Sequence, residues 1–512
     1  TTLFRSRTGN LAGNLRNVKG VLKIAKTSVG TESWLLNLGS ATSYTLTIGG
    51  DLNIEQAPSD STNVSFINDG DGDAVINVSG NYNHEDGHLI FVNVNAETND
   101  GTATLNLAGD LLQSGGDIDF ASGDDGPVGQ KGSMTIKGNL SQTAGTIRST
   151  IIDRDVINGL ITFNKTGLQT FNAADPANTS YINFVIASGA TLKLISDLAI
   201  NRDTVLNWIG KFTVNSGATL DASTFTIASQ IIDDVEDPPA AFTHFNLLAG
   251  GKLITANPTG VEGSIDTANN LTANLSSAAD YEFQGASTGE FITSPAANTV
   301  SDIIINRTSG NVTLAMPLTV TGNLDLTSGL LTTTTTNLPT IGAAGTASPA
   351  TLTSFVNGPL AKTGATAFTF PVGKAGAGFR NIGITALSGS ATFMAEFFRS
   401  GVPDEPLEPT LVRVSSCEYW DLSRPGGTAS ARVILSWEAN SSCGGAYVTD
   451  PTTLSVAHLL GGVWVDEGKA SSTGDNTAGT ITSNDAPTDF SPFALASSSA
   501  SANPVLDRKS VV

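Results

Sequence analysis

Residues 47–54 read TIGGDLNI, and the same pattern returns as NVSGNYNH at 77–84, NLAGDLLQ at 106–113 and TIKGNLSQ at 135–142. An earlier copy, NVKGVLKI, occupies 17–24, and FNKTGLQTF at 163–171 is interpreted as a sixth copy. The copies align on glycines that are 30, 30, 29, 29 and 29 residues apart, namely Gly20, Gly50, Gly80, Gly109, Gly138 and Gly167. Such a period predicts a solenoid, because a coil of two or three short strands cannot bury its apolar face alone.

Apolar and polar residues alternate within each copy. Leu46, Ile48, Leu52 and Ile54 are expected to face inward, while Thr, Asn and Ser face outward. The chain has 512 residues, 54 of them Gly, and only 14% are charged, whereas an ordinary globular domain carries about 25% charged residues. These features predict an all-β fold built on a long parallel β-helix.

The repeat changes its consensus after the first block and later returns to it. IASGATLKL at 186–194, VNSGATLDA at 214–222 and LLAGGKLIT at 247–255 are aligned on Gly189, Gly217 and Gly251, with an acidic insertion at 233–239 interpreted as a surface loop. PLTVTGNLDLTSGLL at 317–331, around Gly322, restores the first pattern. We therefore expect a β-helix over residues 1–402, with regular coils at 1–170 and variant coils at 171–402.

Longer strands rich in aromatic residues follow a proline-containing linker at 403–409. Gly461 and Gly462 between TTLSVAHLL and VWVDEG predict a hairpin turn. The residues expected to form a core here are Val433, Leu435, Trp437, Trp420 and Trp464. We expect residues 403–498 to form an antiparallel β-sandwich that caps the solenoid, because an open end exposes unpaired strand edges. Residues 499–512 are expected to form an extended tail.

The cysteines and the charge indicate the compartment and exclude some partners. Cys417 and Cys443 are the only cysteines, and an isolated pair predicts a disulfide in an oxidising compartment, with two unpaired buried thiols as the alternative. A net charge of −21 argues against nucleic acid as a partner. The sequence contains no apolar stretch long enough for a transmembrane helix. Because it opens with TTLFRSRTGN, we expect a mature, already processed secreted protein.

Six segments in order carry a resemblance to a known group: NSGATLDA, LTVTGNLDLTSGLL, SFVNGPL, FTFPVGKAG, EYWDL and FSPFALAS. Together they resemble large secreted surface proteins of Bacteroidetes, adhesin-like β-helix proteins exported by the type IX secretion system. The resemblance covers about Thr1 to Ala496. It implies an extracellular location and a role in surface structure or attachment. In that group a sorting domain usually follows the FSPFALAS-like segment, so we expect it to be cleaved or absent here.

Acidic loops give the strongest site signal. The calcium candidates lie 7 to 14 positions before a repeat glycine, and they are Asp69, Asp71, Asp73, Asp100, Asp124 and Asp125. Glycine-rich loops with many oxygen ligands suit calcium, although the same loops are also typical of a solvated edge. NHEDGH at 83–88 contains His84 and His88 and would bind a transition metal only if a turn folded both imidazoles inward. His244 and His458 have no obvious partners in the sequence.

The sequence shows no catalytic constellation, so we predict no enzyme activity and no required cofactor, with calcium as an option. A polysaccharide lyase or hydrolase is the rival, but no Asp or Glu pair stands out from the loops. We predict a self-assembling extracellular filament subunit that exchanges strands head to tail with copies of itself. The residues predicted to mediate assembly are Val505, Leu506, Val511 and Val512. The alternative is a monomeric adhesin stalk that binds a glycan or protein.

Overall fold

The structure is a computed structural model. It describes residues 2–4, 9–10, 16–25, 34–37, 43–55, 62–68, 72–94, 101–123, 132–150, 159–175, 179–203, 208–233, 243–285, 289–290, 298–399, 404–439 and 447–503. The chain divides into two compact units, unit 1 with residues 1–257 and 261–279, and unit 2 with residues 258–260 and 280–512.

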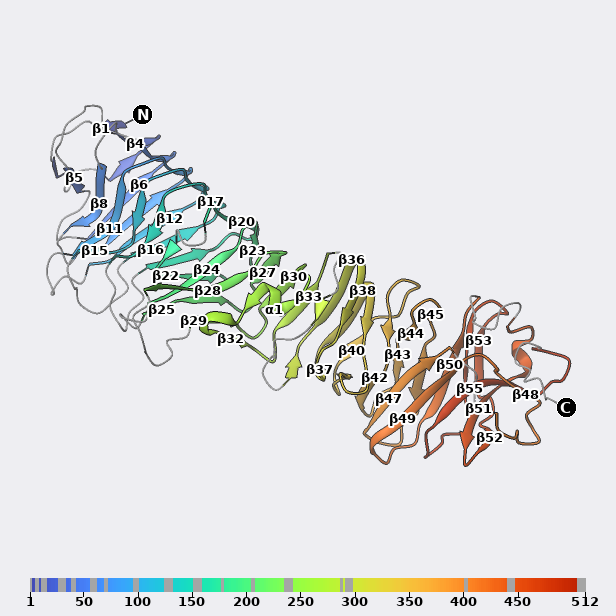
Figure 1. Ribbon diagram of the computed structural model, residues 1–512. Coiled ribbons are helices and arrows are strands. Elements are labelled where there is room, and N and C mark those ends of the chain that lie inside the picture. The colour runs from blue at the N-terminus through green and yellow to red at the C-terminus, as the bar shows by residue number, and fades with distance from the viewer. Residues whose placement is uncertain are drawn as a thin grey trace. The chain divides into compact units, whose positions relative to one another are not determined.

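Unit 1 consists of parallel sheets in which neighbouring strands come from successive coils of the chain (Figure 1). Sheet A contains β1 (Thr2–Phe4), β4 (Leu22–Ala25), β7 (Leu52–Glu55), β10 (Tyr82–His84), β13 (Leu111–Gln113), β17 (Leu140–Gln142), β20 (Gly167–Ala173), β23 (Ala190–Leu194), β27 (Thr219–Ser223) and β30 (Lys252–Thr255). Sheet C contains β3 (Asn17–Val18), β6 (Tyr44–Ile48), β9 (Ala74–Val78), β12 (Ala103–Leu107), β16 (Gly132–Ile136), β19 (Gly159–Phe163), β22 (Ile182–Ile186), β26 (Lys211–Val214), β29 (Thr243–Leu247) and β32 (Leu271–Leu275).

Two further sheets complete unit 1. Sheet B contains β2 (Gly9–Asn10), β5 (Trp34–Asn37), β8 (Thr62–Asn68), β11 (His88–Val94), β14 (Asp117–Asp119), β15 (Ser122–Gly123), β18 (Thr146–Arg148) and β21 (Thr179–Ser180). Sheet D contains β24 (Leu198–Asp203), β28 (Ile227–Asp233) and β31 (Ile265–Asp266), with β25 (Trp208–Ile209) antiparallel to β24. The short helices are α1 (Val261–Ser264) and η2 (Ala268–Asn270).

Successive strands of unit 1 visit sheets C, A and B in turn up to β21 and sheets C, A and D from β22 onward. Apart from β25, the strands pair in parallel with their equivalents in the adjacent coil. Leu46, for example, is in register with Ile76, and Ile76 with Leu105. The inward positions are buried as expected, with Leu46, Ile48, Leu52 and Ile54 at most 1% exposed. The architecture is all-β with long parallel sheets, which is consistent with the predicted β-helix.

The register corrects two positions of the predicted repeat. Leu140 pairs with Phe171, so Gln169 rather than Gly167 is the equivalent of Gly138. Gly167 instead begins a second row in which its N–H donates to Gly189 O, and the Gly217 N–H donates to Gly250 O rather than to Gly251. The glycines of this second row have φ angles of 100°, 79°, 72° and 71°, namely Gly167, Gly189, Gly217 and Gly250. Spacing alone missed these shifts because insertions lengthen the corners.

Unit 2 begins with smaller coils that alternate between two sheets (Figure 1). Sheet F contains β33 (Asp280–Phe283), β34 (Gly289–Glu290), β36 (Ile303–Thr313), β38 (Asn323–Thr332), β40 (Thr346–Ala347), β41 (Val356–Asn357), β44 (Val372–Lys374) and β45 (Gly378–Phe379). The first strands of sheet E are β35 (Thr299–Val300), β37 (Leu318–Val320), β39 (Pro339–Ile341) and β42 (Leu360–Gly364). β35, β37, β39 and β42 pair in parallel with one another.

Pairing becomes antiparallel where β42 meets β47. Sheet E continues with β47 (Ala391–Phe398), β48 (Arg413–Val414), β49 (Tyr419–Gly427), β51 (Leu454–Leu460), β52 (Val463–Asp466) and β55 (Pro492–Ser497). Sheet G, antiparallel throughout, contains β43 (Phe368–Phe370), β46 (Ile382–Thr385), β50 (Arg432–Trp437), β53 (Ser471–Gly474) and β54 (Gly479–Thr482), and the short helix η4 spans Pro451–Thr453. Antiparallel pairing therefore starts before residue 403, where the predicted cap begins.

Two local predictions for the C-terminal region are confirmed. Gly461 and Gly462 connect β51 to β52, with φ angles of 59° and 80°, as a two-residue hairpin turn with positive φ at both positions requires. The aromatic and aliphatic residues expected in a core are each at most 1% exposed, namely Trp420, Val433, Leu435, Trp437 and Trp464.

Candidate functional site

A row of Asp and Asn side chains, called the Asx ladder, lies just after the repeat glycines at the corner between sheets C and A. Its members are Asp51, Asn81, Asp110 and Asn139. Each Asp or Asn side chain accepts a hydrogen bond at Oδ1 from the backbone N–H of its equivalent one coil later. Written as donating N–H to accepting Oδ1, the bonds are Asn81 to Asp51 (2.7 Å), Asp110 to Asn81 (2.9 Å), Asn139 to Asp110 (2.6 Å) and Thr170 to Asn139 (2.9 Å). Unit 2 repeats the device, since the Asn323 N–H donates to Asp302 Oδ1 at 2.7 Å.

The Asx ladder explains why glycine precedes it. A Cβ atom at Gly109 would lie 2.4 Å from both Asn81 Oδ1 and Gly80 O, and a Cβ at Gly138 would lie 2.4 Å from Asp110 Oδ1. The side chain of one coil thus occupies the space that a side chain of the next would need. Gly80, Gly109 and Gly138 are therefore needed for close approach between coils, and the Asx residue beside each one joins those coils.

A second ladder, the His–Gln ladder, lies at the corner between sheets A and B. His84 is in register with Gln113, and Gln113 with Gln142. The side chain of each residue contacts the carbonyl oxygen three residues ahead, through His84 Nε2 to Gly87 (3.3 Å), Gln113 Nε2 to Gly116 (3.0 Å) and Gln142 Nε2 to Gly145 (3.2 Å). All three side chains are buried. Sequence reasoning missed this ladder, although the shared 29-residue spacing with the glycines contained the signal.

Burial sets the protonation of His84. Its Nδ1 lies 2.7 Å from the Tyr82 hydroxyl, so the neutral ring accepts from the hydroxyl and donates from Nε2 to Gly87 O. Burial lowers the pKa of His84 from 6.5 to about 4, because the charged imidazolium would lose its hydration. The ring is therefore neutral at pH 7.

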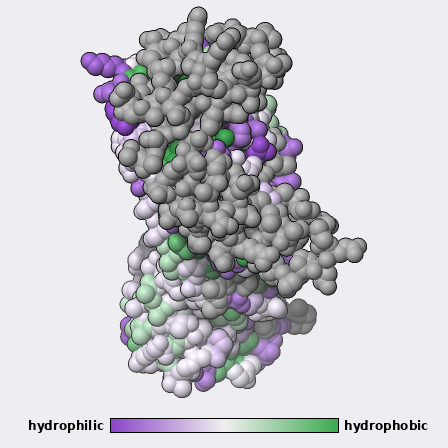
Figure 2. Space-filling view, turned by 90° about the vertical axis from the view of Figure 1, so that its left-hand side faces the viewer, coloured by the Kyte–Doolittle hydropathy of each residue, from purple (hydrophilic) through white to green (hydrophobic). Residues whose placement is uncertain are grey.

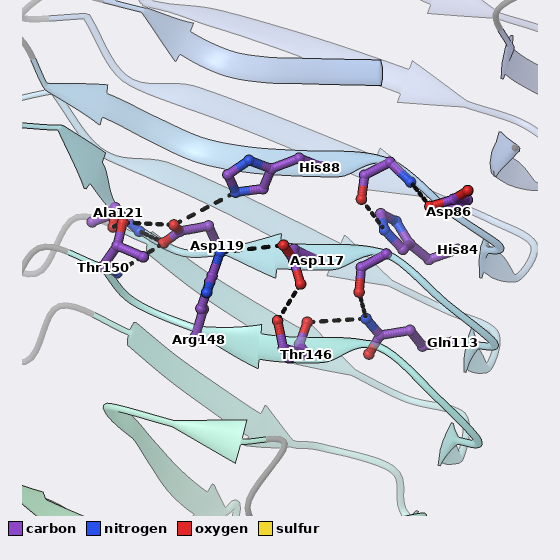
Figure 3. A network of polar contacts seen from close by, with 12 residues as sticks. His84, Asp86, His88, Gln113, Asp117, Asp119, Ala121, Thr146, Arg148 and Thr150 are labelled. Atoms are coloured by element: carbon purple, nitrogen blue, oxygen red, sulfur yellow. Dashed lines mark hydrogen bonds and ion pairs between the residues drawn. The ribbon is translucent and has the colours of Figure 1, made fainter. Parts of the chain in front are cut away.

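A cluster of charged side chains lies on the outward face of sheet B (Figure 3). His88, Asp117, Asp119 and Arg148 come from β11, β14 and β18. His88 Nε2 lies 3.6 Å from Asp119 Oδ2, and Arg148 Nη2 lies 3.2 Å from Asp117 Oδ2. Two carboxylates, an imidazole and a guanidinium on one face are the residue types that acid–base catalysis uses.

The contacts within this cluster favour a structural role. Asp119 is fully buried, and its carboxylate accepts from the Ala121 and Thr150 N–H groups at 3.1 Å and from Thr150 Oγ1 at 2.7 Å. Asp117 accepts from Thr146 Oγ1 as well as from Arg148. The carboxylates thus bond coils to one another, and Asp119 offers no exposed oxygen to a substrate.

The predicted calcium residues fall mostly beyond the part that the structure describes. Asp69, Asp71, Asp100, Asp124 and Asp125 all lie outside the described residues. Asp73 is described and exposed, and its Oδ1 accepts from Thr102 N at 3.1 Å and Thr102 Oγ1 at 2.6 Å. Within the described ranges no group of three or more His, Cys, Asp or Glu residues is placed to hold a metal ion.

The two imidazoles of NHEDGH are not brought together. His84 points into the solenoid toward Tyr82, whereas His88 points toward Asp119 on the outer face (Figure 3). The reason is the turn at 85–87, which separates β10 from β11 and interrupts the alternation of side chains, so that His84 faces the core and His88 starts an outward row. Asp86 accepts from the Gly87 N–H at 2.7 Å and holds the turn between the two histidines.

Both remaining histidines have partners that the sequence did not reveal. His458 is buried, its Nδ1 lies 2.9 Å from Glu467 Oε1, and its ring stacks on Phe493 with centroids 4.3 Å apart. His244 Nδ1 lies 3.4 Å from Asn274 Nδ2. Burial, with a smaller contribution from Lys211, lowers the pKa of His244. Both partners come from neighbouring strands or loops, so their positions depend on the register.

Of the residues predicted to form the disulfide and to mediate assembly, the structure describes only Cys417. Cys417 is described and is not a free thiol, whereas Cys443 lies outside the described residues, so their pairing stays a prediction. Val505, Leu506, Val511 and Val512 also lie outside them.

The tail is described up to Asn503, which is buried. Its Oδ1 accepts from the Thr449 and Asp450 N–H groups at 2.7 and 2.9 Å, and its Nδ2 donates to Thr453 Oγ1 at 3.0 Å. The start of the predicted extended tail is therefore fixed to its own unit.

Large apolar side chains that reach the surface are distributed over both units. Those that are exposed among the described residues are Leu112, Leu168, Ile195, Leu248, Leu352, Val412, Leu460 and Val463. Figure 2 shows hydrophobic and hydrophilic residues intermixed on the face that it presents. None of the helices in the described part of the chain is long and apolar enough to cross a membrane.

Comparison of the chain with models of known protein families, with curated proteins and with solved structures finds no match.

Proposed function

We propose that this chain is an extracellular structural protein, a subunit of a self-assembling surface filament. The observation that carries the proposal is the use of polar side chains to join coils. The Asx ladder bonds successive coils, and in the His–Gln ladder Gln142 Nε2 donates to Gln113 Oε1 of the preceding coil at 3.0 Å. Pairs on the sheet faces join coils in the same way, such as Asn83 with Asn53 (2.7 Å) and Asn106 with Asn77 (3.0 Å). Side chains used in this way stabilise a long scaffold.

The finer architecture belongs to the same proposal. We propose a parallel β-helix that ends where β42 pairs with β47, followed by sheets E and G packed as a β-sandwich cap. Buried Trp420 in sheet E and buried Trp437 in sheet G support such a packed core. A disulfide between Cys417 and Cys443 would stabilise the cap by about 3 kcal/mol in the chain-entropy model. Export by the type IX system follows from the sequence resemblance alone.

Electron microscopy of the purified protein at several concentrations, with and without calcium, tests the filament proposal. Regular filaments that lengthen with concentration are the expected result. Isolated particles at every concentration would contradict it and favour the adhesin alternative, which a glycan-binding screen would then examine. Release of products from acidic or neutral polysaccharides would contradict a purely structural role.

A further inference from the structure

An open hollow lies on the outer face of sheet A, where β10, β13 and β17 run side by side. Its volume is about 230 Å³, which is below the roughly 300–1,000 Å³ of sites for drug-sized ligands but leaves room for one sugar unit. The side chains at its surface come from three successive coils and include Asn83, Glu85, Leu112, Ser114, Ser141 and Thr143. The stacking of the coils therefore sets the spacing of the groups that a ligand would meet.

The middle of the hollow belongs to an uncharged row of side chains that runs from coil to coil. Its members are in register on the outer face of sheet A, and they are Asn53, Asn83, Leu112, Ser141 and Asn172. Neighbouring members are about 4.8 Å apart, so the row spans about 19 Å. A sugar unit of a linear glycan has a length similar to this spacing. A glycan laid along the row therefore presents one unit after another to successive coils.

The hollow offers hydrogen-bonding groups that the protein itself does not use. Within the described part of the chain, the side chains of Glu85, Ser114 and Ser141 form no hydrogen bond or ion pair. The Asn83 amide donates to Asn53 Oδ1 at 2.7 Å, which leaves Asn83 Oδ1 as an acceptor. Hydroxyl groups both donate and accept, whereas a carboxylate and an amide oxygen only accept. Together these groups match the hydroxyls of a sugar, which also donate and accept.

Leu112 gives the hollow an apolar centre. Its side chain is 38% exposed, and it stands between Asn83 and Ser141 of the neighbouring coils. A sugar ring combines hydroxyl groups at its edge with apolar C–H groups on its faces. Contact between such a face and leucine removes apolar surface from water on both sides. An apolar centre with polar groups around it therefore suits a sugar ring.

Charge decides which class of glycan fits. Among the described residues that line the hollow, Glu85 alone is charged, and the whole chain has a net charge of −21. An anionic polysaccharide would meet a carboxylate in the hollow and a repulsive field around it. We propose that the hollow and its row bind a neutral glycan, whose chain lies across β10, β13 and β17 from coil to coil. This inference goes beyond the proposed function, because a single subunit is enough for it.

The test is a titration of end-labelled oligosaccharides with the full-length protein, followed by fluorescence anisotropy. The neutral probes are cellohexaose, laminarihexaose, mannohexaose and chitohexaose, and hexagalacturonate is the anionic comparison. We expect saturable binding of at least one neutral probe and none of hexagalacturonate. Leu112→Ala removes the apolar contact, and Ser141→Trp fills the hollow, so each should weaken binding about tenfold or more. The matched controls lie on the outer face of sheet C, and Leu160→Ala and Ser133→Trp should bind as the unmodified protein does.

Leu112→Ala shortens an exposed side chain and leaves the core unchanged, so it keeps the test valid if Ser141→Trp fails to fold. Absence of saturable binding of all four neutral probes would overturn the inference. Unchanged binding by Leu112→Ala, or equal losses in the hollow variants and their controls, would also overturn it. Tighter binding of hexagalacturonate would contradict a neutral ligand.

Electron microscopy of the same samples separates this inference from the proposed function. Filaments without glycan binding would overturn the inference and leave the proposed function standing. Glycan binding without filaments would support the hollow as a glycan site and contradict the proposed function.

Discussion

In the repeats at Gly50, Gly80, Gly109 and Gly138, the glycine and the Asx residue after it act as one unit. The glycine was recognisable from spacing, but its cause was not, because the side chain that requires it belongs to the preceding coil. Asn81 follows Gly80 in the chain, yet its Oδ1 occupies the space beside Gly109. A contact of this kind becomes visible only when the register of the coils is known.

Gly109→Ala is expected to destabilise the protein by about 1–3 kcal/mol, the usual cost of overpacking. The new Cβ would lie 2.4 Å from Gly80 O and Asn81 Oδ1, so coils must shift apart. Gly20→Ala is the matched control, since no atom lies within 4 Å of a Cβ at this same repeat position. Urea unfolding should show it neutral or slightly more stable. Equal losses in both variants would contradict the close-approach argument.

His84 gives the molecule a predictable response to acid. Its folded pKa of about 4 lies below the unfolded value of 6.5, so the unfolded chain binds more protons between these pH values. The neutral ring makes its full contribution to the free energy of unfolding above pH 6.5. This contribution falls by about 3 kcal/mol in total as the pH decreases toward 4. His84→Gln, which copies Gln113 and Gln142 of the same ladder, should remove this part of the pH dependence.

Urea unfolding of both proteins at pH 7, 6, 5 and 4 measures the difference. We expect similar stabilities at pH 7, because glutamine can make the same bond to Gly87 O, and a growing advantage of the variant at lower pH. Parallel stability curves for the two proteins would show that His84 is not the group responsible.

At the scale of the element, β14 carries two carboxylates on one face with different surroundings. Asp119 is fully buried and bonded to Ala121 and Thr150, whereas the Asp117 side chain is 35% exposed beside Arg148. Asp119→Ala would leave buried N–H groups without acceptors and should cost about 2 kcal/mol or more. Asp117→Ala, the matched control, should cost about 1 kcal/mol or less, because solvent screens an exposed ion pair. Thermal or urea unfolding measures both, and a larger loss for Asp117→Ala would contradict the burial argument.

The sequence predicted elements better than it predicted their exact alignment. Strict alternation placed Leu46, Ile48, Leu52 and Ile54 in the core, and the Gly461–Gly462 dipeptide fixed a hairpin, because both signals are local. Gly167 was misaligned because lengthened corners shift the frame without changing the local pattern. The partners of His88 and His458 come from another coil or strand, so no spacing along the chain could identify them.

At the scale of the whole molecule, the two units use the Asx ladder in the same way but with coils of different size. Tyr82 of unit 1 is in register with Leu111, 29 residues later, whereas Ile303 of unit 2 is in register with Leu324, 21 residues later. Both keep an Asp or Asn that accepts from the next coil. The corner bond is therefore independent of what the rest of the coil contains, which allows insertions without loss of the stack.

Removal of residues 504–512 is the change that should separate assembly from folding. The cut falls just after Asn503, so its bonds to Thr449, Asp450 and Thr453 remain. We expect an unchanged unfolding midpoint and no filaments, measured by calorimetry and by sedimentation with electron microscopy. Removal of residues 503–512 should also abolish assembly, but it should lower stability by about 1–3 kcal/mol because buried groups lose their partner. Filaments that persist after the shorter deletion would contradict assembly through the tail, and equal stability of both truncated chains would contradict the role of Asn503 as its anchor.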